Sequence, residues 1–292
     1  DDAPRDHEAF EIWKKHIPEN RIYFMPAKNN WWSPGDNGPC GPDSEMFYDV
    51  TGKLGDMTKE EYLLADERQD VVEIWNDVFM EYEKKNAKVI GKLKSKNVDT
   101  GSGLERITTM VQGKTNIFDT DIFELLISKI AELAGGEILN QRASRIVADH
   151  TRASVMLIAD GVIPSNTDRG YILRRLIRRA VRYADVLGVE HGKLAELVPV
   201  VSEKYKGIYD NVFTQKDFIA KEIWEEEDRF RKTLERGLKE LTNILDKGVI
   251  TGTEAFDLFA THGFPFELTE EIAHERGIIV DRDGFYAEMK KH

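Results

Sequence analysis

Apolar and polar residues follow two different periods along this chain. A period of two is clearest over residues 71–82, and a spacing of three and four dominates after residue 121. The alternating segment predicts a strand, because successive side chains of a strand point to opposite faces. Asn76 and Val78 then share one face of that strand, whereas Glu73 and Trp75 point to the other.

The first part of the chain predicts an α+β arrangement around this strand. Turn-forming residues are dense over residues 29–44, which predicts a loop there. The other elements expected in this part are a helix at residues 7–15, strands at 45–50 and up to Asp99, and a helix from Leu104.

Beyond residue 121 the apolar spacing is that of amphipathic helices. Helices are expected at residues 121–134, 145–159, 169–182 and 215–247. The pair Gly135 and Gly136 would end the first of these helices. It is therefore the predicted boundary between two domains, residues 1–136 and an all-α domain at residues 137–292.

Composition narrows the classes of protein to which the chain can belong. Its 292 residues have a formal charge of −12, which argues against a general nucleic-acid coat protein and makes any such contact local. No apolar run approaches the roughly 18 residues of a membrane span, and the N-terminus does not resemble a signal peptide. The single cysteine, Cys40, excludes internal disulfides and cysteine-rich zinc sites, as expected for a cytoplasmic protein.

Against this acidic background, residues 169–182 contain six arginines and no acid. The segment predicts a helix with one apolar stripe and two flanking rows of arginines, Arg174, Arg178 and Arg182 in one and Arg175 and Arg179 in the other. Like charges four residues apart repel by roughly 0.2–0.5 kcal/mol per pair. The rows therefore face either a polyanion or carboxylates of the same protein, and the pattern leaves both possibilities open.

Residues 99–106, Asp-Thr-Gly-Ser-Gly-Leu-Glu-Arg, join the end of a strand to a glycine turn and the start of a helix. Glycines let a ligand approach the backbone closely, and an arginine can fork onto a phosphate or lie flat on a purine. The pattern is compatible with nucleotide binding. By itself it does not exclude an ordinary turn capped by Asp99.

In its setting this segment resembles the third signature motif of class II aminoacyl-tRNA synthetases, in the version of the alanyl-tRNA synthetases. Similar blocks follow in the family's order over almost the whole chain: GDNGPCGP at 35–42, SEMFYD at 44–49, EIWNDVFM at 73–80, DTDIF at 119–123, RIVADH at 145–150, IADGVIPSN at 158–166, RGYILRR at 169–175, TLERG at 233–237 and GFP at 263–265. The chain is therefore identified as a member of this family.

The resemblance implies a pocket for L-alanine, and the matching residues are Trp32, Asn76, Val78, Asp99 and Gly101. Asp99 would pair with the substrate ammonium, Asn76 would hold polar groups, and Val78 and Trp32 would wall a niche for one methyl group. Such a niche discriminates by only about 1–3 kcal/mol per methylene, so editing elsewhere is expected. Ordinary core packing remains the alternative for Trp32.

The resemblance also implies a site for ATP, formed by Gly101, Gly103 and Arg106. Asp99 and Arg106 are then the expected catalytic residues. Mg²⁺ is the expected cofactor, with unknown ligands. Asp36, Glu45 and Asp49 lie nearby in the sequence, although salt bridging or turn capping is the alternative for each.

The family contacts the acceptor stem of tRNA(Ala), and Asn166 matches the asparagine that contacts its G·U pair. A helix cap is the alternative role for Asn166. The expected RNA-binding residues are Asn166, Arg169, Arg174, Arg175, Arg178 and Arg182. The family usually has a partner aspartate where this chain has Ala260, so base reading must depend on Asn166, on His262 nearby or on other groups.

The family's first and second motifs and its editing modules do not occur in this sequence. Because the second motif supplies an arginine that clamps phosphate, the chain alone is not expected to form alanyl-adenylate. The favoured hypothesis is part of an alanine–tRNA ligase that works with a separate N-terminal synthetase portion. The alternatives are a non-catalytic tRNA-binding paralogue, the tRNA-recognition half of a split synthetase, or a helical protein whose basic face pairs internally.

Overall fold

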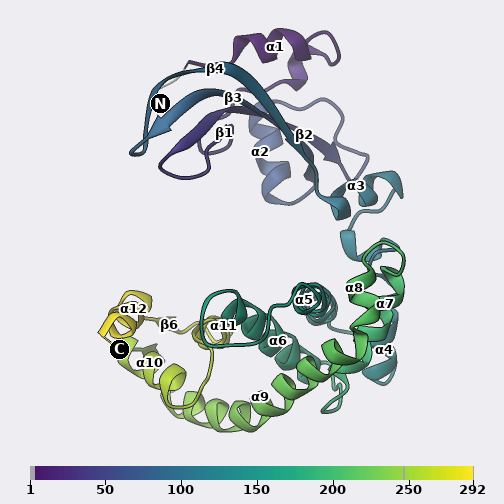
Figure 1. The fold of residues 1–292 in the computed structure, drawn as a ribbon, viewed down its shortest axis with the longest axis vertical. Helices are drawn as coiled ribbons and strands as arrows, with labels where there is room; N and C mark the ends of the chain where they lie inside the picture. The colour runs from purple at the N-terminus through teal and green to yellow at the C-terminus, as the bar shows by residue number, and fades with distance from the viewer. Residues whose placement is uncertain (1–3, 246, 292) are drawn as a thin grey trace. The chain divides into compact units, whose positions relative to one another are not determined.

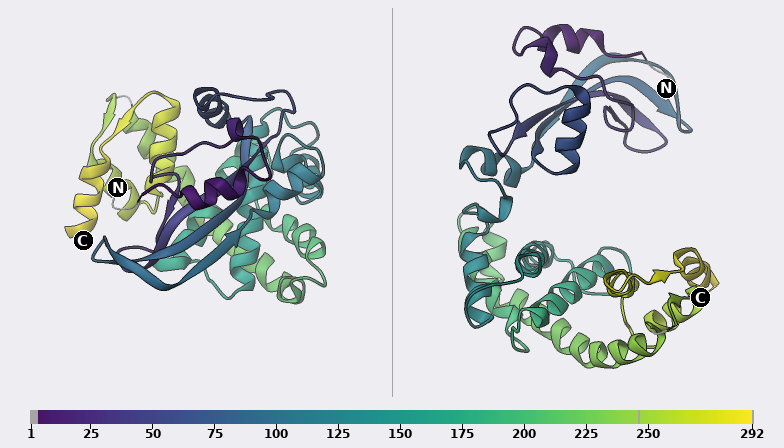
Figure 2. Two further views of the ribbon diagram at one scale, coloured as in Figure 1. Left: turned by 90° about the horizontal axis from the view of Figure 1, so that it is seen from above. Right: turned by 180° about the vertical axis from the view of Figure 1, so that it is seen from behind.

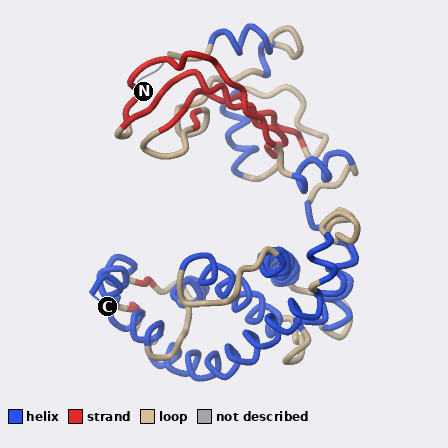
Figure 3. Tube along the Cα trace, viewed as in Figure 1, coloured by secondary structure: helices blue, strands red, loops and turns tan. Residues whose placement is uncertain are grey.

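The computed structural model describes residues 4–245 and 247–291. The chain forms two compact units, residues 1–122 and residues 123–292. Strands dominate the first unit and helices the second (Figure 3). This division precedes the predicted boundary at Gly135 and Gly136, because α4 (Glu124–Leu133) packs against α5 (Gln141–Ala159) of the second unit.

The first unit is built on an antiparallel sheet with the strand order β1-β2-β3-β4. Its strands are β1 (Trp31–Trp32), β2 (Gly38–Asp49), β3 (Val71–Lys85) and β4 (Lys88–Gly101), and they twist along their length (Figure 1). β3 confirms the alternating strand. β2 begins well before the predicted residue 45, so the end of the predicted loop at residues 29–44 is strand instead.

Gly41 explains how a segment rich in glycine and proline enters this sheet. A Cβ atom at Gly41 would lie 1.8 Å from the carbonyl oxygen of Phe79 on β3. Only glycine allows that approach. The pairing of β2 with β3 is irregular between Cys40 and Asp43 at the same place.

Helices complete the first unit. They are α1 (His7–Trp13), α2 (Lys59–Glu67) and α3 (Leu104–Val111), with short 3₁₀ turns at Glu19–Arg21 and Ile117–Asp119. No helix was predicted where α2 lies. Thr58 and Glu61 form a capping box at its start, and Tyr62 and Ala65 bury against Val71 of the sheet.

Among its described residues, the second unit is helical apart from one small two-stranded ribbon. Its further helices are α6 (Asp168–Val186), α7 (Val198–Lys204), α8 (Asp210–Thr214), α9 (Lys216–Leu245), α10 (Gly252–Ala260), α11 (Phe266–Glu275) and α12 (Arg282–Lys291), with a 3₁₀ turn at Leu194–Leu197. β5 (Val249–Ile250) pairs in parallel with β6 (Ile279–Val280). The prediction was an all-α domain, and this short ribbon departs from it.

The long helices of this unit follow the apolar spacing. α9 is long and curved (Figure 2), and it matches the helix predicted at residues 215–247, of which residue 246 lies outside the described residues. α5 packs along α6, where Leu173, Ile177 and Ala180 are fully buried. No helix in the described ranges combines the length and apolar character needed to cross a membrane.

Candidate functional site

Four of the five residues predicted to bind alanine lie in two adjacent rows across the sheet. Val78 is opposite Asp43 of β2 and Asp99 of β4. Asn76 is opposite Glu45 of β2 and Gly101 of β4. Residues directly opposite one another share a face, and the pairing is regular between Asn76 and Val78. The predicted common face of Asn76 and Val78 is therefore confirmed.

The Asn76 side chain links the two rows. Its Nδ2 donates to Asp43 Oδ2 and to Glu45 Oε1, both at 3.1 Å. Asn76 Oδ1 and Asp43 Oδ1 are buried and have no hydrogen-bond partner. Buried acceptors without donors are costly, so this position is suited to a ligand that brings N–H groups and positive charge.

The carboxyl groups beside Asn76 lie in a poorly solvated place. Burial, reinforced by the charges of Glu73 and Asp43, raises the pKa of Glu45 to about 7. Burial also raises the pKa of Asp43, although the hydrogen bond from Asn76 opposes that shift. A cation bound here would favour the ionised form of both groups.

The prediction that Glu73 points away from this face is wrong. Met46 pairs with Trp75, but the next residue, Phe47, pairs with Glu73, so Ile74 is an extra residue on β3. Such a bulge resets the alternation of side chains. Glu73 therefore shares the face of Asn76, in line with its effect on the pKa of Glu45.

Glu73 also holds the arginine of the predicted nucleotide motif. Arg106 Nη1 donates to Glu73 Oε2 at 3.0 Å and to its carbonyl oxygen at 3.2 Å. The Arg106 side chain remains half exposed and lies against Gly103, where a Cβ atom would meet Arg106 Cδ at 3.4 Å. Asp99 Oδ1 accepts from the backbone of Thr100 at 3.0 Å, and the residue is exposed.

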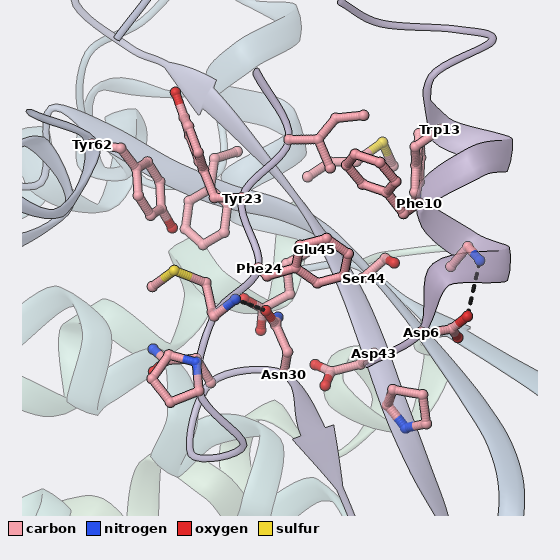
Figure 4. Close-up of a pocket in the computed structure, with 18 of the residues that line it drawn as sticks. Asp6, Phe10, Trp13, Tyr23, Phe24, Asn30, Asp43, Ser44, Glu45 and Tyr62 are labelled. Carbon is pink, nitrogen blue, oxygen red and sulfur yellow. Dashed lines mark hydrogen bonds between the residues drawn. The ribbon is translucent and has the colours of Figure 1, made fainter. Parts of the chain in front are cut away.

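Trp32 of β1 lies apart from the two rows. It is opposite Gly41 of β2, and 40% of its surface is exposed. Trp31, which was not among the predicted site residues, lies with its ring tilted against that of Tyr82, with ring centroids 5.7 Å apart, and lines a cavity of the first unit. Figure 4 shows Asp43 and Glu45 facing into this cavity between aromatic side chains from residues 10–24 and Tyr62. The cavity therefore borders the two rows.

The carboxylates considered for Mg²⁺ do not converge. Asp49 accepts from the backbone of Thr51, Gly52 and Leu54 in a turn, and these bonds outweigh burial and lower its pKa. Asp36 is exposed. Within the described residues there is no group of three or more histidine, cysteine or acidic side chains suited to a metal ion.

In the second unit, carboxylates of the same protein partner most of the arginines of α6. Three of these carboxylates lie on α11 and one on α9: Arg175 pairs with Glu267 at 2.6 Å, Arg179 with Glu271 at 2.8 Å, Arg182 with Glu275 at 2.9 Å, and Arg178 and Arg174 with Glu226 at 2.7 and 3.3 Å. Figure 1 shows α6 beside α5 and α11. Of the two possibilities left open for these rows, internal pairing is the one the structure contains.

Two predicted RNA-binding residues remain accessible at the start of α6. Asn166 and Arg169 are exposed, and Arg169 makes no ion pair or hydrogen bond within the described part of the chain. Asn166 does not cap the helix, because Thr167 is the N-cap residue. Instead, its Oδ1 accepts a hydrogen bond from Arg174 Nη1.

A family model and similar known proteins both point to tRNA synthetases. The family model described as tRNA synthetases class II (A) matches residues 1–292. The alanine–tRNA ligases of Borrelia hermsii (strain HS1 / DAH) and Borreliella afzelii (strain PKo) are each 43% identical, over 99% and 100% of this chain and 50% of their own length. That of Bacillus thuringiensis subsp. konkukian is 42% identical over 99% of this chain. The chain spans 34% of that relative and half of the other two.

Proposed function

Because this chain belongs to the class II tRNA synthetase family, we propose that it supplies the amino-acid-binding face and the RNA-docking helices of an alanine–tRNA ligase. The observation that favours this function is the convergence of Asn76, Val78, Asp99 and Gly101 on one face of the sheet. The reaction joins the alanine carboxylate to the α-phosphate of ATP with loss of pyrophosphate. The alanyl group then passes from the adenylate to a hydroxyl at the end of tRNA(Ala), and AMP leaves.

In this proposal the ammonium group of alanine lies between Asp99 and the buried acceptors of Asn76 and Asp43. Asp99 is exposed, and its carboxyl group supplies the negative charge. The unpartnered oxygens of Asn76 and Asp43 accept N–H groups. Val78 lies between the two aspartates in its row and contacts the substrate methyl group.

ATP is proposed to lie over the turn at residues 101–103, with Arg106 on its phosphate or purine. Glu73 orients the arginine through a charge-assisted hydrogen bond. Exposed Gly101 and Gly103 leave the backbone open to close approach. No group of three or more histidine, cysteine or acidic side chains that could hold Mg²⁺ occurs among the described residues.

Binding of a non-hydrolysable alanyl-adenylate analogue, measured by calorimetry, tests the amino-acid site. Asp99→Asn should weaken binding about tenfold to a hundredfold, because a hydrogen bond to a charged group contributes about 1.5–3 kcal/mol. Asp77→Asn is the matched control, since Asp77 lies on the opposite face of β3 between Asn76 and Val78. Absence of analogue binding, or equal effects of both substitutions, would count against the site and favour a non-catalytic RNA-binding role.

We also propose that the start of α6 docks on the acceptor stem, with Asn166 at the G·U pair and Arg169 on the phosphates. In this proposal Arg174, Arg175, Arg178 and Arg182, which carboxylates already partner, shape and orient the surface. Binding to acceptor-stem hairpins with G·U or G·C tests this. Asn166→Ala should abolish the preference for G·U, whereas Asn243→Ala, an exposed asparagine of α9, should preserve it.

A further inference from the structure

Glu226 of α9 is a fully buried carboxylate at the centre of the second unit. Its exposed fraction is 0%. Its Oε1 accepts from Arg178 Nε at 2.7 Å and lies 3.3 Å from Arg174 Nε, while Arg229 Nε lies 3.5 Å from Oε2. The contacts with Arg174 and Arg229 are ion pairs rather than hydrogen bonds, since Arg174 Nε and Glu226 Oε2 have no hydrogen-bond partner. A buried charge is costly unless it is paired, so these arginines and Glu226 depend on one another for their positions.

The same two arginines of α6 extend beyond Glu226 to two separate loops. Arg174 Nη1 donates to Asn166 Oδ1 in the loop that precedes α6. Arg178 Nη1 donates at 2.6 Å to the carbonyl oxygen of Gly263, in the turn between α10 and α11. That turn also contains His262, and Ala260 ends α10 just before it. One buried carboxylate is therefore linked, through one arginine each, to both segments considered for base reading.

A guanidinium group transmits position along such a link. It is planar and rigid, so the hydrogen bond of Arg178 Nε to Glu226 and the ion pair of Arg174 Nε with the same carboxylate restrict the direction in which each Nη1 points. Arg174 and Arg178 are only 19% and 13% exposed, which restricts their rotamers further. Displacing Glu226 would release Asn166 and Gly263 together.

The link also sets the polarity of Asn166. Every hydrogen of a guanidinium group is a donor, so the Asn166 atom that faces Arg174 must be the amide oxygen. The exposed amide Nδ2 then remains available as a donor. Asn166 can therefore recognise an acceptor on a base edge, but it cannot offer its oxygen to a base donor without losing Arg174.

The turn between α10 and α11 also contacts α9 at a second point, Gly237. A Cβ atom at Gly237 would lie 2.3 Å from Phe264 Cδ2, so the Phe264 ring occupies the space that glycine leaves on α9. Tyr171 of α6 contacts Phe259 of α10, with ring centroids 6.4 Å apart. The segment at residues 259–264 is thus packed against α6 and α9, next to the arginines that Glu226 holds.

We propose that Glu226 is a positioning residue for RNA recognition, which fixes the donor amide of Asn166 and the turn at Gly263 relative to each other through Arg174 and Arg178. Glu226 does not itself contact RNA in this scheme. The inference rests on the proposed docking of the acceptor stem at the start of α6. It specifies that Asn166 acts as a hydrogen-bond donor to a base acceptor.

The test compares the affinities of the full chain for acceptor-stem hairpins that differ only in G·U or G·C. Glu226→Gln keeps one acceptor oxygen but removes the negative charge and replaces the other oxygen by an NH₂ group, so the charge-assisted contacts with Arg174 and Arg178 weaken. The preference for G·U should fall roughly tenfold, the cost of about one base-reading contact, while binding of the G·C hairpin and its salt dependence stay unchanged. Glu227→Gln is the matched control, because Glu227 is equally buried on α9 but pairs with Arg231 and the backbone of Gly192.

Two further variants keep the test decisive if Glu226→Gln unfolds the second unit. Arg174→Lys retains the charge but lacks the fork that joins Glu226 to Asn166, so it should lower the preference in a folded protein. Asn166→Asp keeps the acceptor for Arg174 and removes the donor, so it should abolish the preference. Circular dichroism melts of each variant establish folding.

The outcomes separate this inference from the proposed function. If Asn166→Ala abolishes the G·U preference but Glu226→Gln and Arg174→Lys both retain it, the positioning role is overturned and the docking proposal stands. If Asn166→Asp preserves the preference, the assignment of Asn166 as a donor is overturned. If the parent chain shows no preference, or Asn166→Ala leaves it intact, the docking proposal fails and this inference fails with it.

Discussion

The side-chain amide of Asn76 donates at 3.1 Å to Glu45, the residue directly opposite it in the β2–β3 pair. Burial and the charges of Glu73 and Asp43 raise the pKa of Glu45 from 4.5 to about 7. The folded protein therefore keeps a proton on Glu45 that the unfolded chain has already released. The contribution of Glu45 to stability is most favourable below about pH 4.5 and declines as the pH rises to about 7.

Glu45→Gln should reverse that decline. Glutamine keeps the acceptor for Asn76 but cannot ionise, so the variant should match the parent below about pH 4.5 and become the more stable protein towards pH 7. Urea unfolding of both proteins between pH 4 and 8.5 measures the difference in stability, in which titrating groups that do not interact with Glu45 cancel.

Glu61→Gln provides a control of opposite sign in the same unit. Hydrogen bonds from the backbone and hydroxyl of Thr58 lower the pKa of Glu61, so its stabilising effect is present above the unfolded pKa and lost as the pH falls. The deficit of this variant should shrink in acid. A constant difference between Glu45→Gln and the parent across the pH range would contradict the buried, proton-holding role of Glu45.

Arg169→Ala should weaken binding of all acceptor-stem hairpins to a similar degree. Arg169 is exposed and has no partner within the described residues, so it is free to neutralise a phosphate. The slope of log affinity against log salt should fall by about one. Arg182→Ala is the contrast, because Glu275 and Glu271 hold Arg182; it should lower the melting temperature and leave the slope nearly unchanged.

Gly237→Ala should destabilise the second unit although alanine is the better helix former. An exposed glycine in a helix interior gains about 1 kcal/mol on conversion to alanine. Here the new methyl group would collide with Phe264, and overpacking costs about 1–3 kcal/mol. Chemical denaturation measures the change.

The Phe264→Leu background tests the cause of that loss. A smaller side chain there should remove most of the penalty of Gly237→Ala, so the two changes should be strongly non-additive. A stabilising effect of Gly237→Ala in the parent would show that this contact is not tight.

Glu73→Ala should weaken binding of ATP or of the adenylate analogue several-fold. It removes the carboxylate that orients Arg106, at 3.0 Å, without touching Arg106 itself. Glu83→Ala, an exposed substitution on the same strand, is the control. If the two variants bind the nucleotide with equal affinity, Glu73 has no role in the nucleotide site.

On β3 the sequence predicted the direction of some side chains correctly and of one wrongly. Alternation along β3 placed Asn76 and Val78 on one face because side-chain direction in a regular strand depends only on position. The same rule failed at Glu73. Phe47 of β2 pairs with Glu73 rather than with Ile74, so Ile74 forms a bulge that reverses the alternation. Bulges depend on the partner strand, which the local pattern does not contain.

The sequence by itself determined the long helices α5, α6 and α9 and the strand β3, since apolar spacing is a local property that these elements obey. It also determined that the arginines of α6 required negative partners, because charges stacked at i,i+4 repel. Only the tertiary structure decided which partners. Glu226 and Glu271 approach α6 through the packing of α9 and α11, and no local pattern encodes contacts between residues so far apart in the chain.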